Sequence, residues 1–477
     1  MTEFETSLGY SQVLVTGAGV SGASVARLLR KLGVEVTLVD DNEATLSAVA
    51  AETGVDTASV NKAAGLVAAG WPDLIVTSPG WRPDSALFGL ASDAGIEIIG
   101  DVELAWRVDQ AQLCGPKRTW LAVTGTNGKT TTTAMLAEIM QAHGRKTGHT
   151  AQAVGNIGTA VCDALTSTER IDVLVAELSS FQLHWSCQLH PSAGVLLNVA
   201  EDHLDWHGSF EAYGQAKARV LNADHPIAGV DDSHVRALAT QDNLVGFTMN
   251  APAAGQVGVV DGKIVDATGG EPVEIAPTQG IEPAGPAGIY DALAATAAAR
   301  SQGVSPETIA QALADFSVAG HRGAIVARGQ QTWIDNSKAT NPHAAEAALA
   351  AIDPNDGVAW IAGGQLKGAS IEDVVKNHGH RMRSASVIGV DGAEIVEALR
   401  THAPHVRVTH VTSTDPLRAM HLACEAASIS EASTVLLAPA AASLDMYTGM
   451  AQRGDVFARA AQMCEDNRIT DLPGQGA

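Results

Sequence analysis

One glycine-rich turn constrains the fold of this 477-residue chain more than any other feature of its sequence. An apolar run at residues 120–124 leads into G-T-N-G-K-T at residues 125–130, and a helical pattern over residues 131–143 follows. A turn between a buried strand and a helix presents backbone N–H groups and the helix N-terminus to anionic oxygen atoms. The pattern predicts a phosphate-binding loop, with Lys129 at the β- and γ-phosphates and the Thr130 hydroxyl at Mg²⁺.

This turn departs from the usual phosphate-loop spacing, because Val123 stands at the first glycine position. The alternative interpretation is a glycine-rich turn that binds no phosphate. The strand before the turn and the helix after it favour the phosphate loop over that alternative.

Strand and helix patterns alternate along the chain, which predicts parallel sheets with helical crossovers. We expect an α/β fold of three domains: a Rossmann-like N-terminal domain (residues 1–107), a P-loop mononucleotide-binding central domain (108–319) and a Rossmann-like C-terminal domain (320–477). Residues 222–286 are interpreted as hairpins and loops of the central domain. The predicted strands are 13–16, 34–39, 74–77, 120–124, 173–176, 194–198, 332–335, 358–362, 386–390, 406–410 and 435–438, and the predicted helices include 23–31, 131–143, 291–300 and 343–351.

Composition excludes several classes of protein. A net charge of −23 argues against a non-specific nucleic-acid binder, which needs a basic face. Five cysteines without a C-x-x-C pair argue against a disulfide framework or a zinc–thiolate site. The first ten residues do not form a signal peptide, and no apolar run is long enough to cross a membrane. We therefore expect a cytoplasmic protein, not inserted in a membrane, and a monomer.

A second glycine motif lies near the N-terminus. G-A-G-V-S-G at residues 17–22 follows a predicted strand, and Asp40 stands about twenty residues further on, as in a dinucleotide-binding fingerprint. Taken alone, this motif favours an NAD-dependent oxidoreductase. It is weak evidence for any particular ligand, so that alternative stays open at this point.

Four motifs of the central segment occur together in one known superfamily. T-G-T-N-G-K-T-T at residues 124–131, E-L-S-S-F-Q-L at 177–183, N-V-A-E-D-H at 198–203 and Q-A-K-A-R at 215–219 resemble the motifs of the Mur ligase and folylpolyglutamate synthetase superfamily. The resemblance implies ATP and two Mg²⁺ ions, with a carbamylated lysine at Lys217 as an anionic ligand. The catalytic and metal-binding residues that it implies are Thr130, Lys129, Glu177, His203 and Lys217.

The physical chemistry of these residues agrees with that assignment, although single residues also have other interpretations. Phosphate-bound Mg²⁺ needs hard oxygen or imidazole ligands, and Glu177 follows an apolar strand where an unpaired carboxylate is expensive to bury. Lys217 by itself predicts a surface lysine. His203 and His207 lie four residues apart, so a His–His metal pair is a competing interpretation, although we expect His207 to be solvated.

Motifs of the last third resemble those of the D-glutamate-adding branch of the Mur ligase family. They are G-H-R at residues 320–322, D-N-S-K-A-T-N at 335–341, G-G-Q-L-K at 363–367, P-A-A-A-S-L-D at 439–445 and Q-R-G at 452–454. D-Glutamate brings two carboxylates, which cations and hydroxyl donors bind. The resemblance places Thr340, Lys367 and Ser443 at D-glutamate, and it places Lys338 and His321 toward ATP.

The resemblance also assigns the nucleotide and nucleotide-sugar contacts. In this family the N-terminal Rossmann-like domain holds the UDP of the substrate rather than NAD, and an S-P-G turn like the one at residues 78–80 favours the ligase. The expected UDP-substrate residues are Gly19, Val20, Ser21, Asp40, Asp41, Ser78 and Asn156. The expected ATP residues are Gly125, Thr126, Asn127, Gly128, Lys129, Thr130, Thr131, Asp291, Arg322, Asn336 and Lys338.

Some positions depart from the family pattern. Asp291 replaces an asparagine at the adenine edge, and an aspartate accepts hydrogen bonds but does not donate them when ionised. Asn336 replaces an aspartate expected at the ribose, and Met450 replaces an aromatic residue near the glutamate site. None of these changes removes the triphosphate or metal residues.

The function implied by the resemblance is an ATP-dependent amide ligase that adds D-glutamate to UDP-N-acetylmuramoyl-L-alanine through an acyl-phosphate. It would belong to the synthesis of peptidoglycan precursors. Besides the NAD-dependent oxidoreductase, a nucleotide-sugar-binding regulator without catalysis is an alternative, which ATP consumption independent of D-glutamate would favour.

Overall fold

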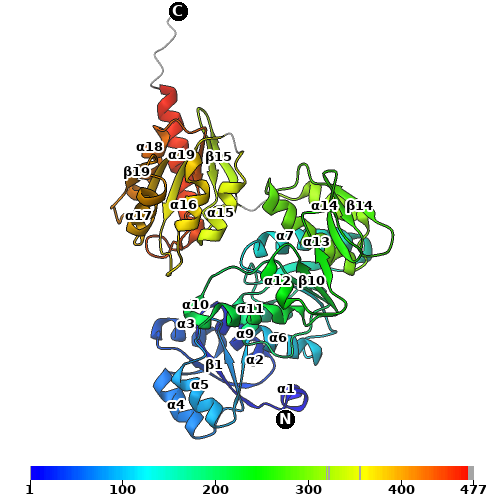
Figure 1. Cartoon of the computed structure of the whole chain (residues 1–477). Coiled ribbons are helices and arrows are strands. Elements are labelled where there is room, and N and C mark those ends of the chain that lie inside the picture. The colour runs from blue at the N-terminus through cyan, green and yellow to red at the C-terminus, as the bar shows by residue number, and fades with distance from the viewer. Residues whose placement is uncertain (1, 318–319, 321–322, 354–355, 471–477) are drawn as a thin grey trace, which may run out of the picture. The chain divides into compact units, whose positions relative to one another are not determined.

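A computed structural model describes residues 2–317, 320, 323–353 and 356–470 of the chain (Figure 1). The chain divides into two compact units. The first comprises residues up to Val199, Leu204–Gln279 and Tyr290–Phe316, and the second comprises Ala200–His203, Gly280–Ile289 and Ser317–Ala477. The first unit contains two sheets and the second unit contains one.

The N-terminal sheet has five parallel strands in the order β3-β2-β1-β4-β5. This is the strand order of a Rossmann-like half, and its reversal point lies between β1 and β4. The strands are β1 (Gln12–Thr16), β2 (Glu35–Val39), β3 (Asp56–Ala58), β4 (Leu74–Thr77) and β5 (Glu97–Gly100). The helices are α1 (Glu3–Leu8), α2 (Val20–Lys31), α3 (Glu43–Thr53), α4 (Val60–Ala68), α5 (Ala86–Asp93) and α6 (Asp101–Gln110).

The second sheet has nine strands, in the order β14-β13-β12-β11-β10-β9-β6-β8-β7. Its strands are β6 (Thr119–Thr124), β7 (Ala151–Gly155), β8 (Val173–Glu177), β9 (Ala193–Leu196), β10 (His225–Gly229), β11 (Val245–Phe247), β12 (Gln256–Val260), β13 (Lys263–Asp266) and β14 (Val273–Pro277). The helical segments are α7 (Lys129–Thr147), α8 (Val161–Leu165), α9 (Ser180–His184), α10 (Leu204–His207), α11 (Phe210–Ala218), η1 (Arg219–Leu221), α12 (Ser233–Leu238), α13 (Pro286–Ser301) and α14 (Pro306–Asp315).

The interpretation of residues 222–286 is right for one part of the segment and wrong for another. β12, β13 and β14 pair antiparallel, as hairpins do. β10 and β11 instead extend the parallel sheet beyond β9, with α12 between them. The strands β10 and β11 are short and lack the alternating pattern of a hairpin, so only their pairing in the folded sheet distinguishes them from loops.

The C-terminal sheet has six strands in the order β15-β16-β20-β17-β18-β19, and only its edge strand β15 runs antiparallel. Its strands are β15 (Ala324–Arg328), β16 (Thr332–Asp335), β17 (Val358–Gly363), β18 (Met382–Ile388), β19 (Arg407–His410) and β20 (Thr434–Leu437). The helical segments are α15 (Pro342–Ala350), α16 (Glu372–His378), η2 (Gly379–Arg381), α17 (Gly392–His402), α18 (Pro416–Ser428) and α19 (Met450–Thr470).

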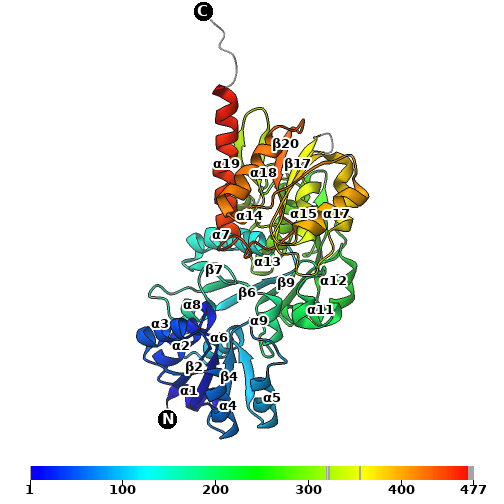
Figure 2. The same cartoon turned by 90° about the vertical axis from the view of Figure 1, so that its left-hand side faces the viewer.

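Two separate cores cover this C-terminal sheet. Buried side chains of α15, α16 and α17 form one core, and those of α18 and α19 form the other, where these two helices pack side by side (Figure 2). A sheet with helices on both faces is the doubly wound arrangement. The prediction of an α/β fold with three domains is confirmed, whereas the predicted domain boundaries stay predictions.

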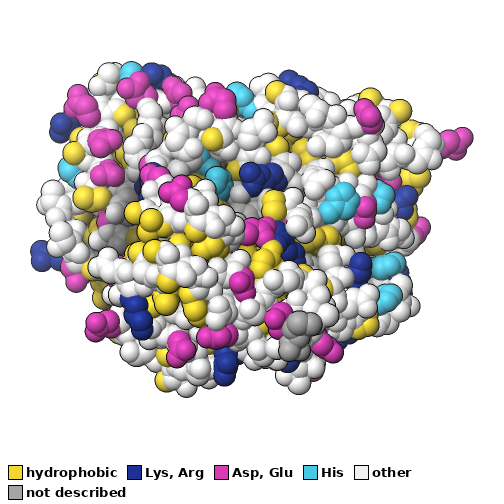
Figure 3. All heavy atoms as spheres, turned by 90° about the horizontal axis from the view of Figure 1, so that it is seen from below, with side chains coloured by type: hydrophobic (Ala, Val, Ile, Leu, Met, Phe, Trp, Pro, Cys, Tyr) yellow, Lys and Arg dark blue, Asp and Glu magenta, His cyan; other side chains and the backbone are white. Residues whose placement is uncertain are grey.

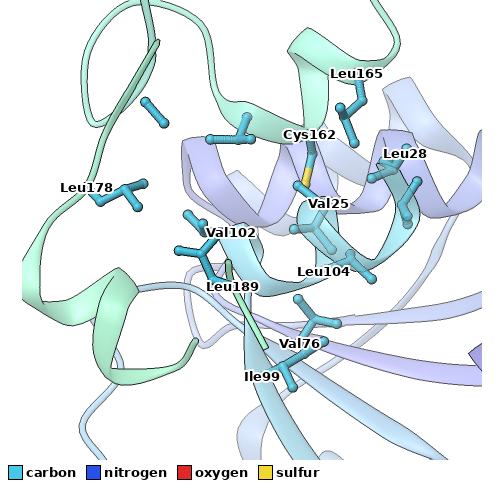
Figure 4. Close-up of a cluster of buried hydrophobic side chains, with 14 of the residues drawn as sticks. Val25, Leu28, Val76, Ile99, Val102, Leu104, Cys162, Leu165, Leu178 and Leu189 are labelled. Atoms are coloured by element: carbon cyan, nitrogen blue, oxygen red, sulfur yellow. The ribbon is translucent and has the colours of Figure 1, made fainter. Parts of the chain in front are cut away.

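The two sheets of the first unit share one hydrophobic core. Figure 4 shows Val25 and Leu104 of the N-terminal helices close to Cys162 and Leu165 of α8. Apolar burial of this kind stabilises the contact by about 25 cal/mol per Å². The core therefore joins the first two predicted domains into one packed unit.

A buried carboxylate reinforces that contact. Glu103 on α6 is fully buried and accepts hydrogen bonds from the backbone N–H groups of Cys187, Gln188 and Leu189 at 3.0–3.2 Å. Arg107, one helical turn later, pairs with the same carboxylate at 2.9 Å. The ionised side chain thus has a full set of partners, without which its burial would be very costly.

The surface carries both signs of charge. On the face drawn in Figure 3, lysine and arginine side chains are scattered among acidic ones, and hydrophobic side chains show between them. Within the part of the chain that the structure describes, no helix combines the length and apolar character needed to traverse a membrane.

We predict that Glu103→Gln lowers the free energy of unfolding by about 3 kcal/mol, because it removes a buried charge from an arginine and from three amide donors. Urea unfolding measured by circular dichroism tests this. Glu35→Gln is the control, because Glu35 is exposed at the start of β2, so its effect stays within about 0.5 kcal/mol. Equal effects of the two substitutions would contradict the role given to Glu103.

Candidate active site

The glycine turn of residues 125–128 lies where β6 ends and α7 begins, and β6 lies between β9 and β8 in the second sheet. Gly128 has a φ of +82°, and a Cβ there would lie 2.3 Å from Oδ1 of Asp291. A Cβ on Gly125 would lie 2.8 Å from the Cβ of Leu197. Only glycine fits these two positions, so the close backbone that a phosphate loop needs is built into the turn.

Two ammonium groups converge on one carbonyl of this turn. Nζ of Lys129 donates to the Gly125 carbonyl oxygen at 2.9 Å, and Nζ of Lys217 donates to the same atom at 2.7 Å. Lys129 also donates to the carbonyl of Thr126. Two like charges at one oxygen atom repel each other, and an anion at the turn would relieve that repulsion.

Lys217 is buried, with 2% of its surface exposed, and its Nζ lies 4.8 Å from the centre of the Tyr213 ring. The expectation that this lysine alone would lie at the surface was wrong. The cause is tertiary: helix α11 packs its Tyr213–Lys217 face toward the glycine turn. A buried ammonium group is costly, which fits a lysine that is carbamylated or that faces an anion.

Two further residues, Asn198 and Tyr213, hold the turn and were not among the predicted site residues. The Asn198 side chain accepts from the N–H of Asn127 at 2.8 Å and donates to its carbonyl at 3.1 Å. The Tyr213 hydroxyl lies 2.9 Å from that of Thr126. Asn198 opens the N-x-x-x-D-H motif, and Tyr213 stands one helical turn before Lys217, so both had a detectable sequence signal.

Glu177 ends β8, the strand next to β6, and is 2% exposed. Its Oε1 accepts from the side-chain amide of Asn156 at 2.9 Å, while its Oε2 has no hydrogen-bond partner among the described residues. A buried, unpaired carboxylate oxygen at the carboxyl end of a strand is suited to a cation. This orphaned oxygen is the observation by which the site fits Mg²⁺.

The first turn of α7 carries consecutive threonines, whose hydroxyl groups lie next to the glycine turn. Thr130 is half-buried on the first turn, and Thr131 behind it is buried. The next residue, Thr132, donates to Asp291 at 3.2 Å. Asp291 thus contacts the phosphate turn, and its predicted contact with adenine stays a prediction.

The histidines of the following loop are placed differently from each other. His203 has a left-handed φ of +53° and its Nε2 lies 3.5 Å from Asp202, but it belongs to the second unit, so its approach to Glu177 stays a prediction. His207 is half-buried, stacks on Phe181 and lies 3.0 Å from the Ser180 hydroxyl. His207 is therefore less exposed than the expected solvated side chain, because aromatic rings on three helices pack against it. Among the described residues, no cluster of three or more His, Cys, Asp or Glu side chains is arranged for a metal ion.

The N-terminal glycine turn has the geometry of a nucleotide-binding loop. A Cβ on Gly17 would lie 2.7 Å from Oγ of Ser78, which follows β4. Asp40 accepts from the N–H of Ala18 at 2.7 Å and therefore fixes the turn itself. Val20 at the start of α2 is 77% exposed, as is expected where a ligand approaches. Of the other predicted UDP residues, Gly19 caps α2, Ser21 lies in its first turn, and Asp41 accepts from the N–H of Val60.

A buried acid, Asp101, lies between this turn and the second sheet. It is 4% exposed at the start of α6, its Oδ2 accepts from Gln182 at 3.4 Å, and its Oδ1 has no partner of normal hydrogen-bond geometry among the described residues. Burial raises the pKa of Asp101, while hydrogen bonding by Ser21 and Gln182 opposes the rise. The carboxyl group thus holds its proton more tightly in the folded chain than in the unfolded chain.

In the C-terminal unit, the three residues predicted to bind D-glutamate all follow the carboxyl ends of strands, at one edge of the sheet. Thr340, Lys367 and Ser443 follow β16, β17 and β20, and these strands are neighbours in the order β16-β20-β17. Carboxyl ends of adjacent parallel strands are where α/β domains bind ligands. The predicted ATP residues Asn336 and Lys338 lie on the loop after β16, whereas His321 and Arg322 lie outside the described residues.

Comparison with known proteins decides the family. Residues 123–299 match the family described as "Mur ligase middle domain", and residues 11–100 match "Mur ligase MurD-like, N-terminal domain". A protein of Corynebacterium diphtheriae is 55% identical over 94% of this chain and 95% of its own length. The chain belongs to the Mur ligase family.

Further relatives match this Mur ligase over nearly its whole length. Proteins of Nocardia farcinica and Mycolicibacterium smegmatis are 45% and 44% identical, over 97% and 95% of this chain and 98% and 96% of their own chains. These two proteins and that of Corynebacterium diphtheriae are all named UDP-N-acetylmuramoylalanine–D-glutamate ligase.

Solved structures resemble this Mur ligase in fold. A pseudomurein peptide ligase type C from Methanothermus fervidus has a TM-score of 0.57 at 18% identity, over 94% of this chain and 99% of that chain. The UDP-N-acetylmuramate–alanine ligase MurC from Thermotoga maritima has a TM-score of 0.55 at 19% identity, over 95% and 99%. At these identities the likeness concerns the fold alone.

We predict that Asn198→Ala raises the KM for ATP roughly 10- to 30-fold, because two hydrogen bonds worth about 1 kcal/mol each no longer hold the phosphate turn. Steady-state phosphate release tests this. Asn243→Ala is the control, since Asn243 is exposed and its side chain also donates to a backbone carbonyl, that of Asp224. An unchanged KM for ATP in Asn198→Ala would contradict the role given to this residue.

We predict that Asp101→Asn stabilises this Mur ligase above neutral pH and that the gain disappears on acidification. The folded pKa of Asp101 is raised above the ordinary value of 3.8, so the cost of the ionised buried carboxyl is fully present above the folded pKa. Below 3.8 both states are protonated and that cost is absent. Thermal melts of both proteins between pH 8 and about pH 4 measure the difference; a gain that grows toward acid would contradict the assignment.

Proposed function

We propose that this Mur ligase joins D-glutamate to UDP-N-acetylmuramoyl-L-alanine, with ATP as the energy source and an acyl-phosphate as the intermediate. The observation that supports it most is the pair of ammonium groups, Lys129 and Lys217, on the Gly125 carbonyl of the glycine turn. Glu177, whose Oε2 has no partner among the described residues, ends the strand next to the one that leads into this turn. Near full-length relatives with the name of this ligase support the choice of substrates.

The first step transfers the γ-phosphoryl group of ATP to the carboxylate of UDP-N-acetylmuramoyl-L-alanine. The bond between the γ-phosphorus and its bridging oxygen breaks, ADP leaves, and a carboxylate oxygen bonds to the phosphorus. Lys129 offsets the negative charge that gathers on the phosphoryl oxygens, while the backbone of residues 125–128 and Asn198 keep the turn in place.

The second step forms the amide. The amine of D-glutamate attacks the carbonyl carbon of the acyl-phosphate, the phosphate leaves with the electrons of the broken C–O bond, and the amine loses a proton. Catalysis depends mainly on orientation and on charge compensation, because the acyl-phosphate is already reactive.

Divalent cations fit this site through the orphaned Oε2 of Glu177 and the hydroxyl of Thr130. We propose that Thr130, Glu177, His203 and a carbamylated Lys217 hold two Mg²⁺ ions. When bound, such ions neutralise phosphate charge and orient the transferred group.

The other substrate contacts follow the same proposal. Thr340, Lys367 and Ser443 bind D-glutamate, and Lys338, Asn336 and Arg322 complete the ATP site with Asp291 and residues 125–131. The UDP part of the substrate is held by the N-terminal domain. Its proposed residues are Gly19, Val20, Ser21, Asp40, Asp41 and Ser78, and Asn156 of the central domain is assigned to the muramoyl part. We place the domains at residues 1–107, 108–319 and 320–477, and the enzyme as a monomer in the cytoplasm.

We predict that Lys129→Ala abolishes ligation, with a loss of at least about 1,000-fold, because the transferred phosphoryl group loses its cationic partner. The assay is phosphate release with UDP-N-acetylmuramoyl-L-alanine, ATP and a panel of amino acids. Lys146→Ala is the matched control: Lys146 lies in the last turn of the same helix and binds Thr308, so activity is retained.

Two results would overturn this proposal. Retained D-glutamate-dependent phosphate release in Lys129→Ala would remove the role of the lysine. Phosphate release by the parent that ignores the amino acid would favour a regulator, and a preference for another amino acid would change the acceptor.

A further inference from the structure

Arg453 lies in the first turn of α19, and its side chain is completely buried in the C-terminal unit. Its Nε donates to the Ser337 hydroxyl at 3.0 Å and its Nη2 to the Ser337 carbonyl at 2.8 Å. Its Nη1 donates to the carbonyls of Gly363 at 3.3 Å and Ala441 at 3.1 Å. One guanidinium group therefore ties three segments together, and all four acceptors are uncharged oxygen atoms.

These three segments precede the residues proposed to bind the amino-acid substrate. Ser337 precedes Thr340 by three positions after β16, and Gly363 precedes Lys367 by four positions at the end of β17. Ala441 precedes Ser443 by two positions after β20. Arg453 is thus the one described side chain that hydrogen-bonds to all three loops.

The loops that Arg453 joins have an unusual backbone. Lys367 and Ala440 have left-handed φ values of +55° and +60°, which residues with a Cβ rarely adopt. Gly364 has a φ of +135°, and a Cβ there would lie 2.0 Å from the Ala442 carbonyl and 3.3 Å from Nη1 of Arg453. Such conformations persist where the surroundings determine them fully, and Arg453 provides bonds that do so.

The hydrogen bonds of Arg453 described above all go to neutral groups, so they do not balance its charge. Burial lowers the pKa of Arg453 to about 10, while Tyr447, Asp445 and Asp335 raise it through charge interactions. The group therefore stays cationic at neutral pH. A buried charge whose hydrogen bonds all go to neutral oxygen atoms is a costly device for holding loops, and a lysine lacks the planar fork needed to reach all of them.

We propose that Arg453 is a positioning residue for the amino-acid substrate, which holds the loops after β16, β17 and β20 in the arrangement that binds it. This inference depends on the proposed function, because Thr340, Lys367 and Ser443 are assigned to the amino acid there. Arg453 itself touches no substrate in this scheme.

Arg453→Lys tests the inference in the full-length enzyme. The KM for the amino acid is expected to rise on the order of 100-fold, as for a site displaced by about 1 Å, while the KM for the UDP substrate stays within about twofold. The KM for ATP is expected to rise less than that for the amino acid, because the proposed ATP residues Asn336 and Lys338 flank Ser337 on one of the three loops. Hydrogen exchange is expected to be faster at the amides of Gly363, Gln365 and Ala442, which bond across these loops.

Arg381→Lys is the matched control within the same unit. Arg381 also donates to backbone carbonyls, those of Leu349, Ile352 and Asp353, but it lies at the opposite edge of the sheet, just before β18 begins. Its replacement is expected to lower the melting temperature without changing the KM for the amino acid.

Ser337→Ala keeps the inference testable where Arg453→Lys does not fold. It removes one acceptor of the guanidinium group, and we expect the KM for the amino acid to rise by about 3- to 10-fold with the KM for the UDP substrate unchanged. An amino-acid KM within about twofold of the parent in folded Arg453→Lys, or in Ser337→Ala where Arg453→Lys is insoluble, would overturn the inference. An equal rise in all three KM values, or the same rise in Arg381→Lys, would overturn it too.

The parent enzyme separates this test from that of the proposed function. Every KM is measured with the amino acid that sustains phosphate release in the parent. If that amino acid is not D-glutamate, the proposed acceptor is wrong, and the Arg453→Lys comparison is still decided with the amino acid that works.

Discussion

The whole site depends on positive charge held beneath a glycine turn. Lys129 and Lys217 approach the same carbonyl oxygen of Gly125 within 2.9 Å, one from the helix that follows the turn and one from α11. Lys217 is buried beside the Tyr213 ring, and the half-exposed Lys129 also donates to the Thr126 carbonyl. An anionic ligand at this turn would balance the charge, and Glu177 on the next strand has a carboxylate oxygen without a partner among the described residues, which suits the cation that accompanies phosphates.

The N-terminal and central sheets pack together as one unit that includes that turn. Their shared core and the fully buried Glu103, which binds three amides of residues 187–189, join them. A nucleotide-sugar bound at the N-terminal glycine turn would therefore keep a fixed orientation toward the phosphate loop, which is what an in-line phosphoryl transfer requires. Asp101 lies in the same interface, and its raised pKa reflects how dry that interface is.

The C-terminal unit differs, since the residues proposed to bind the amino-acid substrate come from three loops rather than from one turn. Loops of this kind are mobile unless side chains tie them down. Arg453 provides the tie, and the left-handed backbone of Lys367 and Ala440 indicates how closely the loops are determined. Two kinds of preorganisation thus occur in one chain: a glycine turn for phosphate, and a buried arginine for the amino-acid loops.

The sequence alone determined the α/β class, the phosphate turn and the motifs that place this chain in its family, because strand-turn-helix patterns and glycine positions are local properties. Only the tertiary structure buried Lys217, surrounded His207 with rings, and joined Asn198 to the turn, because residues far apart in the chain make these contacts. The tertiary structure alone also decided the parallel pairing of β10 and β11 and the hydrogen bonds of Arg453. Burial and hydrogen bonding depend on which elements pack together, and a single residue in a one-dimensional pattern does not record that.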